Sequence, residues 1–239
     1  MKFYLGLTMF LLLSCQNRQD KSVTSNNDTT QINSTETVST DTVQLEEVFI
    51  DSTSVGRKKF NKVEVYKYRA TDSNYVDINF YTKQGDKWKL IQTIHFLKDG
   101  VIGCDTKFSD FNNDGINDMT IVSSVAARGA NEVRRLFIYD KTKDQLIEMK
   151  NSENYPNMLY NKELNCIDAF LVYGGCSTVF LRISGDSLKE FASVEAMDGV
   201  TVREIDRNGK EKIIFQDMKN KAAYIRFKTY KPLKEYDEY

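Results

Sequence analysis

The apolar residues of this chain occur in short alternating runs, and this pattern limits the fold more than any other feature. Beyond residue 45 we find no long segment with the 3.6-residue period of an amphipathic helix, whereas runs such as Val76-Asp77-Ile78-Asn79-Phe80 alternate strictly. A period of two residues is typical of a β-strand with one buried face. Residues 46–239 are numerous enough for one sizeable domain or two small ones, and we predict a single all-β domain.

Within this domain, four segments share the order of apolar strand, connection and hairpin with a polar turn. The turns lie at residues 84–86, 141–143 and 185–186 and near Lys228, and the last three are about 43 residues apart. A repeat of this length is typical of β-propeller blades. We therefore expect a small β-propeller-like domain of repeated antiparallel hairpins, and a β-sandwich is the alternative. In the fourth segment we predict strands over residues 213–215 and 223–227.

The first residues have the pattern of an export signal. One positive charge at Lys2 precedes a mostly apolar run over residues 3–13, which is too short to span a bilayer as a helix and fits a signal peptide. The run ends Leu12-Leu13-Ser14-Cys15, which resembles the lipobox of bacterial lipoproteins. The resemblance implies cleavage before Cys15 and lipidation of its thiol. We expect a protein anchored by lipid to the outer membrane or cell surface, outside the cytoplasm.

The composition of residues 16–45 predicts how the folded domain is joined to this lipid anchor. Residues 16–45 are rich in Ser, Thr and Asn, and no aromatic residue occurs between residues 16 and 42. Such a segment buries too little apolar surface to offset its ordering entropy, so we predict a disordered tether. The formal net charge of −1 gives no reason to expect nucleic-acid binding.

Three cysteines remain beyond Cys15. Cys104, Cys166 and Cys176 allow at most one intramolecular disulfide in an oxidising compartment. The pair Gly174-Gly175 reads as a two-residue hairpin turn, and that register places Cys176 opposite Tyr173 rather than Cys166. A pairing with Cys104 is equally open, so the sequence leaves the connectivity unassigned.

The clearest chemical motif has the form D-x-N-x-D-G-x-x-D and runs from residue 110 to residue 118. Gly115 permits a sharp turn, so oxygen atoms at positions 1, 3, 5, 7 and 9 converge. Oxygen ligands with this much negative charge are those that Ca²⁺ prefers. The predicted ligands are Asp110, Asn112, Asp114, Ile116 (through its backbone carbonyl) and Asp118. The alternative is a polar turn that binds no ion.

The residues around the motif argue against an EF-hand, because position 12 is Ile121 and an apolar strand over residues 119–122 follows the loop. The motif resembles instead the calcium loops of FG-GAP and VCBS-type β-propeller repeats, which implies the same ligands. A shorter echo at residues 206–211 lacks the middle acid, so we predict a turn there without metal. Gly115 and Gly209 are 94 residues apart, about two repeat periods, which predicts equivalent places in a repeated fold.

A wider resemblance covers residues 60–239: a β-rich start, one central calcium loop, and then hairpins rich in Tyr and Phe. Together with the lipobox, this order resembles a family of small calcium-binding periplasmic lipoproteins. That family includes immunity proteins that block lysozyme-like effectors. The resemblance implies a protein partner, with a peptidoglycan hydrolase as the suspected one. We expect the loop that contains Arg128 to lie near the calcium site, where Arg128 is a candidate for partner contact.

The sequence contains no motif that supports a catalytic function. The chain has a single histidine, His95, which lies in a predicted strand, and it has no G-x-S-x-G, HExxH or Gly-rich phosphate loop. We therefore expect a non-catalytic recognition protein. The alternatives are a glycan- or surface-binding module, which would display exposed aromatic residues along a groove, and a purely structural envelope protein.

Overall fold

The computed structural model describes residues 43–99, 102–220 and 223–237. The predicted signal peptide, Cys15 and the predicted tether up to residue 42 lie outside these residues. The described residues belong to one unit, Thr40–Tyr239. The first strand begins at Gln44, two residues before the predicted start of the domain.

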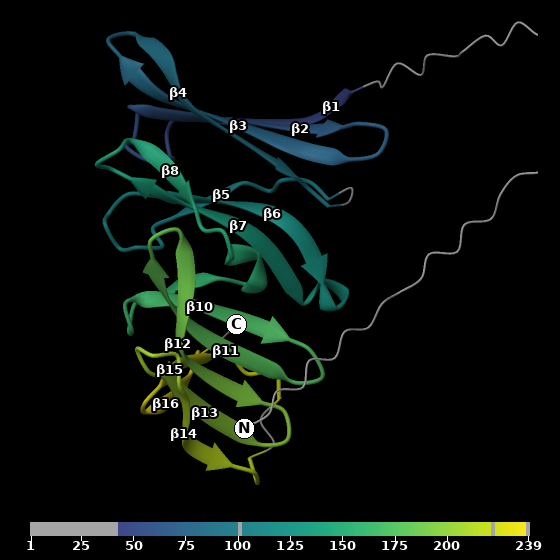
Figure 1. Ribbon diagram of the computed structural model, residues 1–239, viewed down its shortest axis with the longest axis vertical. Helices are drawn as coiled ribbons and strands as arrows, with labels where there is room; N and C mark the ends of the chain where they lie inside the picture. The colour runs from purple at the N-terminus through teal and green to yellow at the C-terminus, as the bar shows by residue number, and fades with distance from the viewer. Residues whose placement is uncertain (1–42, 100–101, 221–222, 238–239) are drawn as a thin grey trace, which may run out of the picture. The chain divides into compact units, whose positions relative to one another are not determined.

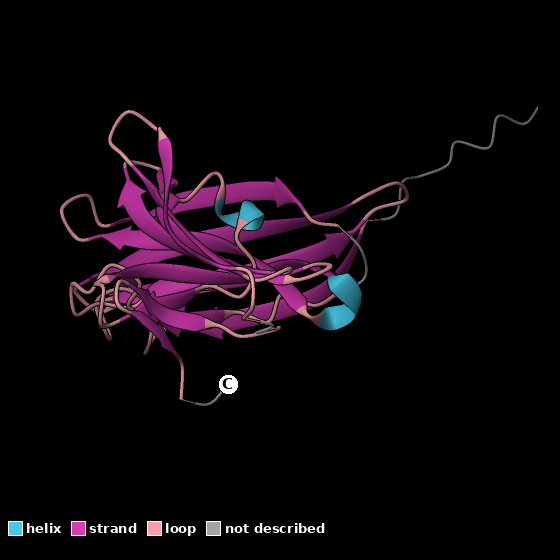
Figure 2. Ribbon diagram, turned by 90° about the horizontal axis from the view of Figure 1, so that it is seen from below, coloured by secondary structure: helices cyan, strands magenta, loops and turns pink. Residues whose placement is uncertain are grey.

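The described residues form antiparallel sheets (Figure 1), and two short 3₁₀ helices interrupt the strands (Figure 2). The first sheet contains β1 (Gln44–Asp51), β2 (Asn61–Arg69), β3 (Asn74–Gln84) and β4 (Lys87–Leu97). The second contains β5 (Lys107–Ser109), β6 (Asp118–Ala126), β7 (Asn131–Asp140) and β8 (Gln145–Glu148). The third contains β9 (Leu159–Asn161), β10 (Cys166–Val172), β11 (Cys176–Ser184), β12 (Ser187–Ala196), β13 (Val200–Ile205) and β14 (Glu211–Asp217). A C-terminal hairpin contains β15 (Phe227–Tyr230) and β16 (Leu233–Glu235), and the helices are η1 (Ala127–Gly129) and η2 (Ser152–Asn154).

The predicted repeat of hairpins corresponds to sets of four successive strands. The turns between β3 and β4, β7 and β8, β11 and β12, and β15 and β16 each join the third and fourth strand of a set. The fourth set differs from the others, because β13 and β14 extend the third sheet while β15 and β16 pair only with each other. Consecutive antiparallel meanders therefore account for the spacing seen in the sequence.

Period-two alternation explains how the sheets pack. On β7, Leu136 and Ile138 belong to the core shared with the third sheet, whereas Phe137 and Tyr139 belong to the core shared with the first sheet. Successive side chains of a strand point to opposite faces, so a continuous apolar run buries both faces. On β11, Phe180 likewise faces the C-terminal hairpin. The second and third sheets are therefore covered on both sides.

The prediction of an all-β fold is confirmed. The cores lie between successive sheets, as in the β-sandwich alternative, in which faces pack on faces. Among the described residues, no hydrophobic cluster joins the first sheet to the third, as a closed ring of blades would require. The repeated antiparallel hairpins are present without that closure.

The prediction for the last hairpin is wrong in two respects. The strand begins at Phe227 rather than at residue 223, and its turn lies at Lys231-Pro232 rather than near Lys228. The cause is Arg226, whose side chain is buried and hydrogen-bonded to Asp168 of the third sheet. This contact fixes the chain just before β15, and it joins residues too far apart in sequence for a local pattern to reveal.

The predicted turn between β10 and β11 is wrong by one residue. Cys176 faces Val172 rather than Tyr173, and the N–H of Tyr173 donates to the carbonyl of Gly175 across a three-residue connection. A Cβ on Gly175 would lie 2.7 Å from the carbonyl oxygen of Ala196, so only glycine permits this close approach. Cys104, Cys166 and Cys176 are free and buried in the described part of the chain, so none of them forms a disulfide there.

Candidate functional site

The D-x-N-x-D-G-x-x-D segment forms a tight loop between β5 and β6. Asp110 follows the last residue of β5, and Asp118 is the first residue of β6. Asn113 and Gly115 adopt left-handed backbone conformations, with φ of 58° and 84°. Glycine and asparagine reach this region at the least steric cost, so the sequence accounts for the sharp curl of the loop.

The curl brings three of the predicted ligands together. Oδ1 of Asp110 and Oδ1 of Asn112 both accept the N–H of Asp114, each at 3.1 Å. Oδ2 of Asp110 accepts the N–H of Gly115 at 2.8 Å, and Oδ1 of Asp114 accepts the N–H of Ile116 at 3.0 Å. Two carboxylates and an amide oxygen therefore gather on one short stretch of backbone, and such donors suit a hard cation.

Asp118 has a different place from these three residues. Its carboxylate is fully buried and accepts the N–H of Phe111 and the N–H of Tyr139, both at 2.8 Å. It thus ties the loop to the neighbouring strand β7. Burial raises the pKa of Asp118 to about 7, and the negative charges of Asp110 and Asp114 add to the rise. A cation in the loop would lower this pKa.

The carboxylate and amide oxygens of the loop are of the type that calcium prefers. The loop brings together only Asp110, Asn112 and Asp114 of the five predicted ligands. Nζ of Lys141 lies 3.7 Å from Oδ2 of Asp114 and supplies a positive charge at the rim. Within the described ranges, no three side chains of His, Cys, Asp or Glu form a cluster that could hold a metal ion. Coordination of calcium by Asp110, Asn112, Asp114, Asp118 and the Ile116 carbonyl stays a prediction.

The loop also lies at the junction of the first two sheets. The N–H of Gly56 donates to the carbonyl of Asn117 at 3.2 Å, and the side-chain amide of Asn117 donates to the carbonyl of Ser54 at 3.0 Å. Ile116 packs against the core between these sheets. Ordering the loop therefore affects the contact between two sheets as well as the turn itself.

The echo of the motif forms a turn, as predicted. The carboxylate of Asp206 accepts the N–H of Asn208 at 2.8 Å and that of Lys210 at 2.9 Å, and Gly209 has a φ of 79°. This turn joins β13 and β14, whereas the calcium-type loop joins β5 and β6. The two loops do not hold equivalent places, because β5 and β6 begin a four-stranded sheet whereas β13 and β14 are the last two strands at one edge of the third sheet.

The prediction that Arg128 lies near the calcium-type loop is wrong. Arg128 follows the end of β6 and the loop precedes its start, and a strand of this length separates its two ends by about 26 Å. Ala127, Arg128 and Gly129 have φ of 49°, 58° and 99°, and all three are exposed. Proximity in sequence misled the prediction because an extended strand places its two ends far apart.

The tip that carries Arg128 is fixed to the neighbouring sheet. The side-chain amide of Asn131 donates to the carbonyl of Val172 at 2.8 Å and accepts its N–H at 2.9 Å. The side-chain amide of Asn157 donates to the carbonyl of Ala130 at 2.8 Å. These contacts hold an exposed arginine on a well-anchored hairpin tip.

The outward face of the first sheet carries a row of aromatic rings. The ring centroids of Tyr66 and Tyr68 are 6.4 Å apart, those of Tyr68 and Tyr75 are 5.0 Å apart, and those of Tyr75 and His95 are 5.1 Å apart. Nδ1 of His95 lies 2.6 Å from Oδ1 of Asp77. Tyr66, Tyr68 and Tyr75 are partly exposed and His95 is exposed, so the row faces solvent.

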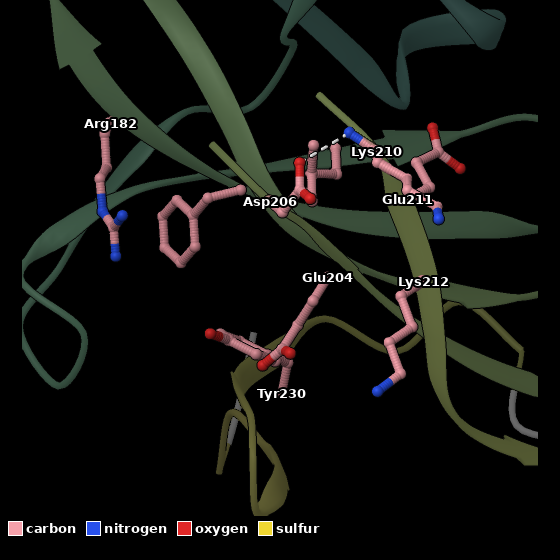
Figure 3. Close-up of a pocket in the computed structure, with 9 residues that line it drawn as sticks. Arg182, Glu204, Asp206, Lys210, Glu211, Lys212 and Tyr230 are labelled. Carbon is pink, nitrogen blue, oxygen red and sulfur yellow. Dashed lines mark hydrogen bonds between the residues drawn. The ribbon is translucent and has the colours of Figure 1, made fainter. Parts of the chain in front are cut away.

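One hollow on the third sheet was missed by the reasoning from sequence. A cavity of about 470 Å³ lies between strands β11 to β14 and the C-terminal hairpin (Figure 3). A second cavity of about 500 Å³ shares the lining residues Lys212 and Tyr230 with it. The residues that line the first cavity come from segments up to about 50 residues apart in the sequence, and no sequence motif marks them. The sequence signal nearest to it is the apolar triplet Ile213-Ile214-Phe215, which follows the charged residues Glu211 and Lys212.

Comparisons with protein families and with curated proteins found no relative of this chain. No protein-family model matches the chain, and no curated protein matches it. In the part of the chain that the structure describes, no helix combines the length and the apolar character that a membrane span requires.

Proposed function

We propose that this chain is a non-catalytic, lipid-anchored protein of the cell envelope that recognises a protein partner. The first candidate for that partner is a lysozyme-like peptidoglycan hydrolase, which the protein would inhibit. The observation that carries the proposal is the anchored hairpin tip with Arg128 exposed at its end. The resemblance of the sequence to calcium-binding envelope lipoproteins supports the same proposal.

The tip has the chemistry needed to enter the cleft of such an enzyme. Glycoside hydrolases of this kind hold two carboxyl groups beside the scissile bond. A guanidinium group can form paired hydrogen bonds with a carboxylate. The contacts of Asn131 and Asn157 fix the backbone before binding, and this reduces the ordering entropy lost on association.

The partner test compares the full-length protein with the variant Arg128→Glu. A suspension of peptidoglycan is treated with each of several secreted lysozyme-like hydrolases, and the loss of turbidity is followed with and without the protein. We expect the wild type to slow at least one enzyme and Arg128→Glu to weaken inhibition at least tenfold, because the reversed charge repels the cleft carboxylates.

The matched control is Arg207→Glu, which reverses an exposed arginine in a different hairpin turn. Its inhibition should equal that of the wild type. Equal inhibition by Arg128→Glu would contradict a role for the tip. Failure of the wild type to bind any hydrolase in the panel would contradict the proposed partner class.

Calcium has a supporting part in this proposal. Bound to Asp110, Asn112 and Asp114, the ion would neutralise the charge that the loop gathers and would order the junction of the first two sheets. Thermal unfolding of the full-length chain should show a calcium-specific rise in midpoint. A hundredfold excess of calcium over Kd stabilises the native state by about 2.7 kcal/mol.

Two variants make the calcium test specific. Asp114→Ala should abolish the calcium-dependent rise, because it removes a central donor of the loop. Asp206→Ala, in the echo turn, should keep it. A midpoint that does not respond to calcium, or that responds equally in Asp114→Ala, would reduce the loop to a polar turn without an ion.

A further inference from the structure

The first sheet has one face that stays open to solvent in the described part of the chain. Val63, Val65 and Ile78 point into the core shared with the second sheet, and successive side chains of a strand point to opposite faces. Tyr66 and Tyr68 therefore lie on the other face, which we call the outer face, and both are only partly buried. Residues directly opposite each other in an antiparallel pair share a face, so the strand register assigns the remaining side chains of the outer face.

Aliphatic side chains border the outer face along both edges of the sheet. The strands β1 and β4 are these edges. The register places Val48 and Ile50 of β1 and Leu90 and Leu97 of β4 on the outer face, each opposite an outward residue of β2 or β3. Their side chains are 48%, 58%, 48% and 67% exposed, in that order. Exposed apolar side chains gathered on one face mark a contact surface for a protein or a membrane.

The part of the outer face between these edges is aromatic. It carries the row of rings from Tyr66 to His95 described above. Nζ of Lys62 lies 4.1 Å from the ring centroid of Tyr81 and 5.7 Å from that of Trp88, so two further rings belong to the same face. Tyr and Trp combine an apolar ring with a polar atom, and they are enriched where a bilayer meets water.

The carboxylates of the outer face are paired within it. Nζ of Lys62 lies 2.6 Å from Oε1 of Glu64, and Nδ1 of His95 lies 2.6 Å from Oδ1 of Asp77. Alternation along β3 also places Lys83 on this face, so two lysines are matched by two carboxylates. A surface that covers the face would therefore bury no unpaired carboxylate. The balance of charge suits zwitterionic headgroups rather than strongly anionic ones.

The chain enters the described domain at the edge of this same sheet. Gln44 is the first residue of the edge strand β1, and Cys15 precedes it by 29 positions. The predicted tether, as a flexible coil, would keep β1 within about 30 Å of a lipid attached to Cys15. At this distance the outer face meets the bilayer at a high effective concentration, so weak contacts are enough to hold it there.

We propose that the outer face of the first sheet lies on the zwitterionic phospholipid surface of the membrane that carries the lipid anchor. The aliphatic edges and the ring of Trp88 would enter the interfacial region of the bilayer. The inference rests on the proposed lipid anchor, which brings the sheet to the membrane. A second copy of the chain could also cover a flat apolar face, but the bilayer is the one surface that the anchor would hold beside β1.

The test uses the fluorescence of Trp88, which is the single tryptophan of the chain. The full-length protein is isolated from cell membranes and reconstituted into phosphatidylcholine vesicles, with and without bromine atoms on the acyl chains. Bromine quenches a tryptophan that lies close to it. We expect at least twofold quenching by the brominated lipid. The quenching should be equal in 0.1 M and 0.5 M NaCl, because the headgroups carry no net charge.

Variants at the two edges test which face makes the contact. Ile50→Glu and Leu90→Glu place an unpaired charge on opposite edges of the outer face, so each should reduce the quenching at least twofold. Ile213→Glu is the matched control, because Ile213 is 53% exposed on a different sheet, and it should be quenched as the wild type is. Thermal melts of the three variants in detergent should match the wild type, which excludes unfolding as the cause.

A separate measurement distinguishes failure of the anchor from failure of the face. Mass spectrometry shows whether Cys15 carries acyl chains. If it carries none, the proposed anchor is wrong, and quenching of Trp88 by an excess of added brominated vesicles then decides the fate of the face alone. An acylated protein whose Trp88 is not quenched would overturn the inference and leave the anchor intact. A change of Trp88 emission with protein concentration in the absence of lipid would also overturn it, in favour of a second copy.

Discussion

The buried ion pair between Arg226 and Asp168 is expected to hold the C-terminal hairpin onto the third sheet. Nε of Arg226 donates to Oδ1 of Asp168 at 2.7 Å, and a second guanidinium nitrogen donates to the carbonyl of Asp168 at 3.1 Å. The other carboxylate oxygen accepts the hydroxyl of Tyr236 at 2.6 Å and the amide of Asn161 at 2.8 Å. Both charged side chains are almost wholly buried.

The change Arg226→Met keeps most of the side-chain volume and removes the charge. Removing one partner of a buried ion pair costs about 3–5 kcal/mol, because the other charge stays buried without compensation. Tyr236 and Asn161 still donate to Asp168, so we expect a loss of about 3 kcal/mol. The double variant Arg226→Met with Asp168→Asn should lose clearly less than the sum of the two single changes, because neither charge remains.

Equilibrium unfolding in urea measures these differences, with far-ultraviolet circular dichroism and the fluorescence of Trp88 recorded together. Trp88 lies in the first sheet, so two transitions at different urea concentrations would show that the hairpin opens separately. Lys228→Met is the matched control: its ion pair with Glu163 is partly exposed, and water screens such pairs. A loss below about 1 kcal/mol for Arg226→Met, or additive losses in the double variant, would refute the reasoning.

Three further predictions concern the core, the backbone and pH. Phe180→Ala should lower the free energy of unfolding by about 3–5 kcal/mol, since Phe180 is fully buried; a urea titration measures this. Gly199→Ala should cost about 3 kcal/mol or more, because φ is 131° and a Cβ would lie 2.7 Å from Cα of Met218; a smaller loss would mean that the turn relaxes. Burial, followed by the charge of Glu211, raises the pKa of Glu190 above its usual 4.5. The stability tied to protonated Glu190 is therefore present at pH below 4.5 and is lost as pH rises through the higher folded-state pKa. Glu190→Gln should raise the melting temperature at pH 7 and weaken its dependence on pH between 4 and 7.

The second, third and fourth strands of the first three sets followed from local patterns, whereas β1, β5 and β9 were not predicted. Alternation predicted the strands around Val76–Phe80, and turn residues predicted the connections at Gly85 and Gly185. Both signals depend on a few neighbouring residues, so a single sequence is enough to show them. The curled loop from Asp110 to Asp118 also followed from its own residues.

Predictions failed where the outcome depended on distant partners. Local pattern placed a strand at residues 223–227, but burial of Arg226 against Asp168, 58 residues away, decided the path of the chain. Sequence proximity placed Arg128 near the calcium-type loop, but the extended strand β6 separates them. In the first case the deciding term was a contact between distant elements, and in the second it was the extended geometry of one strand.

By itself, the sequence determined the all-β class, the order of the hairpins and the shape of the loop around Gly115, because alternation and turn chemistry are properties of short segments. Only the tertiary structure decided that β13 and β14 extend the third sheet, that β7 is buried on both faces, and that Arg182, Phe191 and Tyr230 line one cavity. The physical reason is that sheet membership and burial depend on free energies summed over residues that are distant in the chain, and no local pattern contains that sum.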